Sequence, residues 1–143
     1  MAHTPTMTKS NSKTTYTYAL GRRKSAVATI KLFSGKSSES QVNGQKTTLY
    51  FAGEHNQILI SKPFLVTSTA DKFYYLAKIV GGGKNGQLEA LVLAISRALK
   101  KLDAGHSTVL RAAGLLTVDS RVRERRMVGT GGKARRQKQS PKR

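Results

Sequence analysis

The 143-residue chain contains no cysteine and no tryptophan, and only seven of its residues are acidic. The absence of cysteine excludes disulfides, thiolate metal sites and a cysteine nucleophile. The three histidines, His3, His55 and His106, are scattered without metal-ligand spacing. So few acids offer no pair of carboxylates for acid and base catalysis. We therefore expect no metal, no cofactor and no enzymatic activity.

Long apolar runs are absent as well, because Lys, Arg, Ser or Gly interrupts every apolar stretch. None approaches the roughly 20 residues that a membrane-spanning helix needs. We therefore expect a soluble protein with no membrane partner and no small-molecule substrate.

Positive charge dominates what is present. The chain has 26 Lys and Arg against 7 Asp and Glu, which gives a formal net charge of +19. Because charge of one sign repels itself in a compact state, a polyanion is the simplest partner. The length suits one domain with a real core, since domains cluster near about 100 to 150 residues.

The two ends differ in composition from the middle. Residues 1–15 are rich in Thr, Ser and Lys without an apolar run, so we expect a disordered arm. The arm lacks the apolar segment of a secretory signal, while a transit peptide stays open as an alternative. We expect residues 16–128 to form a globular domain that binds the polyanion and residues 129–143 to form an extended basic tail.

Side-chain periodicity predicts the main elements. Alternation with period two predicts strand in residues 16–33, entered through a basic cluster, and in residues 72–80. The Asn43-Gly44 dipeptide predicts a tight hairpin turn flanked by a short strand. A region of mixed character follows, with a short helix near residues 54–60.

After a triple glycine the apolar period becomes helical, which predicts a helix over residues 84–102. Its apolar stripe consists of Leu88, Leu91, Val92, Ile95, Leu99 and Leu102. Ser107 is expected to cap a second, shorter helix, and Gly114 to end it in the left-handed conformation.

The triple glycine, Gly81-Gly82-Gly83, lies between a predicted strand and a predicted helix and is followed by Lys84. Backbone N–H groups in such a loop can hold a phosphate. The spacing does not fit a nucleotide-binding loop, because Lys78 and Asn85 stand where such a loop has Gly and Ser or Thr. Two interpretations stay open here, an RNA-phosphate contact and a flexible turn.

Two clusters of basic residues are the best candidates for binding RNA. The first, Arg22-Arg23-Lys24, faces no acidic run, although a solvated surface is the alternative. The second begins at residue 121 and holds ten basic residues against one acid, Glu124. Arg donates planar, bidentate hydrogen bonds to phosphate. A nuclear localisation patch and a solubilising tail are the alternatives for the second cluster, and the lack of a DNA-binding motif favours RNA.

Several stretches, read in order, resemble the small-subunit ribosomal protein S-nine family, in its bacterial or organellar form. The resemblance covers nearly everything after Tyr18. It rests on GRRKSAVA at 21–28, VNG at 42–44, YF at 50–51, VGGG at 80–83 with GQ at 86–87, RAL at 97–99, GLLT at 114–117 with Asp119 and Arg121, ERR at 124–126, and KARR at 133–136 with the terminal Lys142-Arg143.

The resemblance implies a two-layer α/β (α+β) fold. It would have a mixed four-stranded sheet with helices on it and an unusual left-handed crossover, like the second domain of ribosomal protein S-five. It further implies a structural constituent of the small ribosomal subunit, in the cytoplasm or in an organelle. There the chain would bind the 3′ major domain of the small-subunit rRNA in the head, beside neighbouring head proteins.

The resemblance and the charge pattern together select the expected contact residues. For rRNA these are Arg22, Arg23, Lys24, Lys84, Arg121, Arg123, Arg125, Arg126, Lys133, Arg135, Arg136 and Lys138. The resemblance assigns a contact with the peptidyl-site tRNA to Lys142 and Arg143.

The chain departs from the family pattern near its end, since Ser140-Pro141 replaces Phe-Ser and removes an aromatic stacking contact. Val118 and Ser120 likewise stand where the family usually has Arg and Pro. Two rival functions stay open, a small kinase-like enzyme of the same fold superfamily and an RNA chaperone that acts off the ribosome.

Overall fold

The computed structural model describes residues 15–35 and 39–126. Three long strands form most of the sheet, with β1 at its edge: β1 (Tyr16–Arg23), β2 (Ala26–Ser34) and β5 (Phe73–Val80). Two short strands, β3 (Gln41–Val42) and β4 (Gln45–Lys46), complete it in the order β1-β2-β5-β3-β4. The β3–β5 pair is parallel and every other neighbouring pair is antiparallel.

The sheet has five strands where the resemblance implies four, and its first part differs most from expectation. Residues 16–34 form two strands, because a tight turn at Lys24-Ser25 folds β2 back on β1 and Arg23 pairs with Ala26. Lys24 has a φ of 52°, a conformation that glycine or asparagine adopts more readily. The basic cluster therefore lies at a hairpin turn and not at the entrance to a strand.

The second predicted turn is confirmed. Asn43 and Gly44 have φ values of 51° and 80°, as a two-residue hairpin between β3 and β4 requires. The Asn43 side chain also bonds to β5, because its Oδ1 accepts from the Ile79 N–H at 2.9 Å and its Nδ2 donates to the Ile79 carbonyl at 3.0 Å. The side chain thereby extends the pairing between β3 and β5.

Within the described residues, four helices accompany the sheet: α1 (Thr47–Tyr50), α2 (Glu54–Val66), α3 (Lys84–Leu102) and α4 (His106–Ala112). The structure confirms the predicted bounds of α3 and the left-handed Gly114 after α4, which has a φ of 72°. By contrast, α2 continues six residues past its predicted end, through the buried Pro63. Ser107 lies inside α4, whose N-cap position is Gly105, so its predicted role as the cap is wrong.

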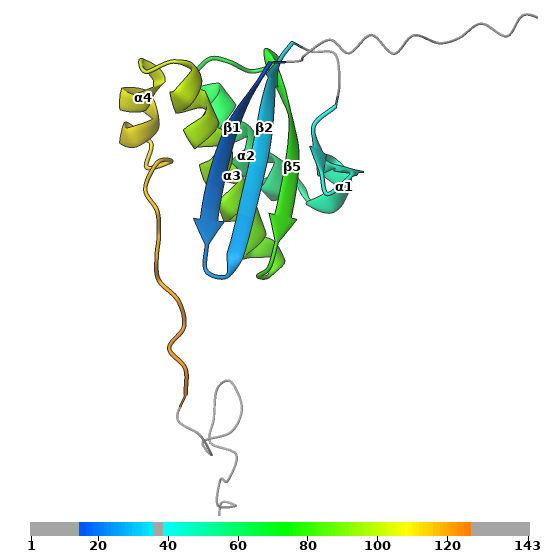
Figure 1. Cartoon of the computed structure of the whole chain (residues 1–143), viewed down its shortest axis with the longest axis vertical. Coiled ribbons are helices and arrows are strands. Elements are labelled where there is room, and N and C mark those ends of the chain that lie inside the picture. Colours follow the sequence, from blue (N-terminus) through cyan, green and yellow to red (C-terminus); the bar gives the residue numbers. More distant parts are fainter. Residues whose placement is uncertain (1–14, 36–38, 127–143) are drawn as a thin grey trace, which may run out of the picture.

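The core lies where α3 packs against the sheet, and α2 and α4 also contact α3. Figure 1 shows α2 and α3 behind the long strands. Ile30 of β2 and Leu91, Ile95 and Leu99 of α3 are fully buried. Because α3 is covered on two sides, its small residues Ala90, Ala94 and Ala98 are buried too, and the buried surface is wider than the predicted stripe. Leu102, at the end of that stripe, is 42% exposed.

Among the described residues, no helix is both long and apolar enough to cross a membrane. The predicted arm lies outside the described residues except for Thr15, and the predicted tail lies entirely outside them.

Candidate nucleic-acid interface

Basic side chains gather at the end of the domain that carries the β1–β2 turn. The glycine loop between β5 and α3 lies at the same end, and the segment after α4 runs beside β1 toward it (Figure 1). A hollow of about 290 Å³ joins the turn to this segment, and one of about 320 Å³ joins it to the glycine loop. We call this region the basic end; its exposed cations are Arg22, Lys24, Lys84, Arg121, Arg123, Arg125 and Arg126.

Arg23 is turned away from this surface. Its side chain is 13% exposed, and its Nε is paired with Glu89 of α3. Its Nη2 lies 3.0 Å from Asp119 Oδ2, and its Nη1 donates to the Arg121 carbonyl at 3.1 Å. Arg23 thus ties the segment after α4 to β1 and α3. The sequence does not predict this role of Glu89 and Asp119, because it shows them only as isolated charges.

Asp119 holds Arg121 in the segment after α4 by hydrogen bonds. Its carboxylate accepts from Arg121 Nη2 at 2.6 Å and from the Arg121 backbone N–H at 3.0 Å. These hydrogen bonds from Arg121 and the nearby Arg23 guanidinium hold the pKa of Asp119 well below its ordinary value. The acid therefore stays ionised, while the Arg121 side chain remains 86% exposed.

Two positions of the glycine loop have no room for a side chain. A Cβ on Gly81 would come within 2.5 Å of the Ser25 carbonyl oxygen, and one on Gly82 within 2.8 Å of the Ala26 side chain. Both have positive φ, 75° and 67°. The loop can therefore lie directly against the β1–β2 turn, which supports the interpretation as a turn without testing the phosphate contact.

Lys84, the first residue of α3, contacts α1. Its Nζ lies 3.5 Å from the centre of the Tyr50 ring and donates to the Tyr50 carbonyl at 3.3 Å. A cation over an aromatic face is held in place by the charge distribution of the ring. Lys84 is thus exposed at the edge of the basic end while it contacts Tyr50.

The other predicted contact residues divide into two groups. Arg123, Arg125 and Arg126 are exposed and belong to no helix or strand. The remaining ones lie outside the described residues: Lys133, Arg135, Arg136, Lys138, Lys142 and Arg143.

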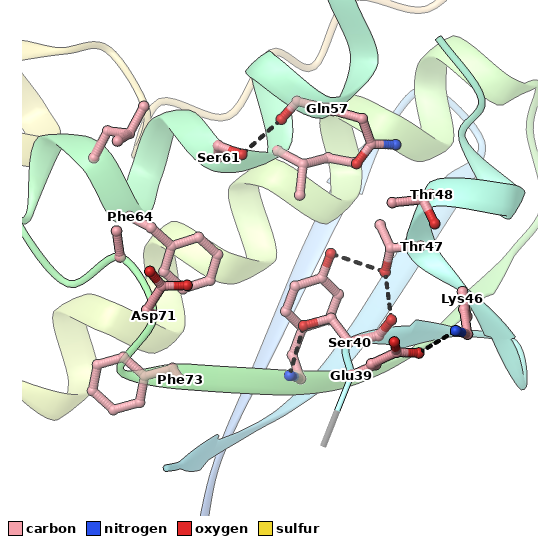
Figure 2. Close-up of a pocket in the computed structure, with 14 residues that line it drawn as sticks. Glu39, Ser40, Lys46, Thr47, Thr48, Gln57, Ser61, Phe64, Asp71 and Phe73 are labelled. Atoms are coloured by element: carbon pink, nitrogen blue, oxygen red, sulfur yellow. Dashed lines mark hydrogen bonds and ion pairs between the residues drawn. The ribbon is translucent and has the colours of Figure 1, made fainter. Parts of the chain in front are cut away.

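A different pocket, of about 520 Å³, lies between α2, the β3–β4 hairpin and the start of β5. Figure 2 shows that its polar groups are paired with one another: Lys46 with Glu39 at 2.8 Å, and Thr47 Oγ1 donating to the Ser40 carbonyl at 3.0 Å. Burial raises the pKa of Tyr75 to about 12, so its hydroxyl stays protonated and donates to Thr47. In the part of the chain that the structure describes, no group of three or more His, Asp or Glu residues could hold a metal ion.

The sequence from the β1–β2 turn onward matches a known family. The model of the family described as ribosomal protein S9/S16 matches residues 21–143, which includes the whole basic end. The chain belongs to this family. Its members are structural ribosomal proteins and not enzymes, so the prediction of a non-enzymatic protein is confirmed and the kinase-like alternative is wrong.

Relatives named "small ribosomal subunit protein uS9" are similar over most of the chain. The relative from Desulfotalea psychrophila is 44% identical over 115 residues, which are 80% of this chain and 88% of that protein. The relative from Methylacidiphilum infernorum is 42% identical over 118 residues, 82% and 86% of the two chains. The relative from Leifsonia xyli is 42% identical over 126 residues, 87% and 74% of the two chains.

Proposed function

We propose that this protein is a structural constituent of the small ribosomal subunit that binds rRNA through its basic end. The observation that carries the proposal is the convergence there of three separate segments, the β1–β2 turn, the glycine loop and the segment after α4. Phosphate contacts supply much of the affinity of proteins for nucleic acids and position them on the backbone. Arg23 contributes indirectly, because it holds the C-terminal segment in place.

The resemblance extends the proposal to finer points. The site on the ribosome is the 3′ major domain of the rRNA in the subunit head, beside other head proteins, on a cytoplasmic or organellar ribosome. The fold is the S-five second-domain type with a left-handed crossover. Lys142 and Arg143 at the chain end reach the peptidyl-site tRNA.

The rRNA contact is tested by titrating binding across salt concentrations. The triple variant Lys24→Gln, Arg125→Gln, Arg126→Gln should weaken binding to small-subunit rRNA and flatten its salt dependence, because each lost phosphate contact reduces the log-log slope by roughly 0.7 to 0.9. Lys62→Gln, at an exposed position of α2, is the matched control and should change neither. An unchanged slope in the triple variant would remove the basic end from the interface.

Stable membership of the subunit is tested by sedimentation. The full chain should co-sediment with small subunits through a high-salt sucrose gradient. A chain that remains at the top of the gradient is instead the off-ribosome chaperone, the alternative that the sequence leaves open.

The tRNA contact is tested with subunits reconstituted from three chains: the full chain, one without residues 142–143 and one without residues 129–143. Both shortened chains should release peptidyl-site tRNA faster, and the longer truncation should have the larger effect. Two charge-assisted contacts at about 1.5 to 3 kcal/mol each set the upper limit for the two-residue truncation. Equal release from all three subunits would leave the tail as an rRNA anchor only.

A further inference from the structure

The face of the sheet that points away from α3 is open. The helices lie on the other face, behind the three long strands in Figure 1. Period-two alternation sends every second side chain to the open face. These are Tyr16, Tyr18, Leu20 and Arg22 of β1, Val27, Thr29, Lys31 and Phe33 of β2, and Tyr74, Leu76, Lys78 and Val80 of β5.

A row of aromatic rings crosses this face. Tyr16 is paired with Phe33, and Phe33 with Tyr74, in the strand register. The ring centres of the first pair lie 5.6 Å apart and those of the second, which are stacked, 5.0 Å apart. Tyr16 is 47% exposed, and its neighbour Tyr18 is 49% exposed. At this exposure, burial within the chain stabilises these rings only partly, and much of their surface remains available to a partner.

Positive charge accompanies the rings. Lys31 and Lys78 stand on the open face, and Lys31 Nζ lies 5.0 Å from the centre of the Tyr16 ring. At the free edge of β1 a hollow of about 410 Å³ is lined by Tyr18 together with Arg97, Lys100 and Lys101 of α3. None of the seven acidic residues of the chain lies in the three long strands.

We propose that this open face is a second RNA surface, which binds unpaired bases by stacking on its tyrosines while the lysines contact the adjacent phosphates. The proposal rests on the proposed function and adds to it a surface, and a class of RNA, that differ from the basic end. Aromatic side chains interleaved with cations are how proteins hold single-stranded RNA, because every base offers a flat face for stacking.

The charge pattern selects RNA over a protein as the occupant. Cations divide the apolar side chains of the face into short groups, and no acid offers a counter-charge to a basic partner. The face also continues into the basic end through Arg22, which stands in its last row beside Val27. One RNA strand can therefore pass from the basic end onto the open face.

The test compares binding of the full chain to a 12-nucleotide oligoadenylate and to a 12-base-pair RNA duplex. Tyr18→Ala and Tyr74→Ala should each weaken oligoadenylate binding about 5- to 150-fold, the range for losing one stacked base. Duplex binding should not change, because paired bases cannot stack on the rings. Tyr18→Phe should retain binding, and Leu49→Ala, which removes an exposed apolar side chain from α1, should change nothing.

The outcomes separate the two proposals. Loss of oligoadenylate binding in the tyrosine variants, with unchanged melting temperature, supports the open face. Normal oligoadenylate binding in both alanine variants overturns it, and loss of a neighbouring protein from subunits rebuilt with them would show that a protein covers the face. The triple variant of the basic end should weaken binding to both RNAs. If it weakens binding to neither RNA while the tyrosine variants lose oligoadenylate binding, the proposed RNA contact at the basic end is wrong and the proposal for the open face is retained.

Discussion

The packed layer between the sheet and α3 and the basic end share strand β1, yet they use its successive residues in opposite ways. Gly21 faces α3 so closely that a Cβ would lie 2.0 Å from the Ala90 carbonyl oxygen. Arg22, the next residue, is exposed at the basic end. Arg23 points back to the α3 side and pairs with Glu89 and Asp119.

The comparison shows that period two decides which cation is available to a partner. A basic residue on the inner face of a strand has to find acids within the protein, because an unpaired charge is costly to bury. A basic residue on the outer face or at a turn stays solvated until a partner arrives. Two adjacent arginines can therefore serve stability and binding separately, and substitutions on each side should separate the two roles.

The largest effect is expected in the packed layer. Leu99→Ala removes a fully buried side chain from α3 and should lower the free energy of unfolding by about 2 to 5 kcal/mol, because a cavity remains. Chemical denaturation followed by circular dichroism measures it. Lys100→Ala, at the next and exposed position, is the control and should be nearly neutral; equal effects of the two changes would contradict the burial of Leu99.

Gly21→Ala tests the closeness of the strand to the helix without removing any contact. The added methyl meets the backbone oxygen of Ala90 at 2.0 Å and the backbone nitrogen of Ala94 at 2.7 Å, and neither atom can move without moving α3. We expect a loss of about 3 kcal/mol, the upper end for overpacking. Gly35→Ala, where a Cβ meets nothing within 4 Å but φ is 105°, shows for comparison the effect of backbone strain without steric contact. Unchanged stability of Gly21→Ala would contradict the close approach of β1 to α3.

Local signals made much of this layer predictable from the sequence. The helical period fixes α3 over residues 84–102, and alternation separates the buried Ala28 and Ile30 of β2 from the outward Thr29 and Lys31. Asn43-Gly44 specifies its own turn by its preference for positive φ. Each of these features depends on neighbours within a few residues of one another.

The features that the sequence did not predict depend on distant residues or on exceptions to local rules. Lys24-Ser25 contains no glycine, asparagine or proline to mark a turn, and the loop packed against it lies more than fifty residues later. Pro63 usually ends a helix because it lacks an N–H, but here it is fully buried within α2. The partners of Arg23 lie 66 and 96 residues away, so only the folded chain shows that this residue is occupied.

A smaller loss of stability is expected where the layer meets the basic end. Arg23→Gln leaves Glu89 without this partner and Asp119 with Arg121 alone. We expect a cost of about 1 to 2 kcal/mol, reduced by the exposure of Glu89. The difference from the unchanged protein should be present at neutral pH. The part of it that comes from Asp119 should be lost as the pH falls through the lowered pKa of that acid, because protonation removes the ion pair in the folded state. A cost that stays constant down to acid pH would mean that Arg23 acts through packing and its hydrogen bonds to backbone carbonyls, and not through the acids.

The smallest change in stability is expected for Arg22→Gln, because the side chain is exposed and no acid is paired with it among the contacts of the described residues. Unfolding should be unaltered within about 0.5 kcal/mol, the usual range for surface positions. Binding to small-subunit rRNA should nevertheless weaken, with the salt slope reduced by roughly 0.7 to 0.9 for one lost phosphate contact. Arg23→Gln should show the reverse pattern, with lower stability. Its salt slope for rRNA binding should change only if the segment after α4 is released from β1. Salt titrations and denaturation curves for the two variants measure both quantities, and matching profiles for Arg22 and Arg23 would show that alternation along β1 does not divide their roles.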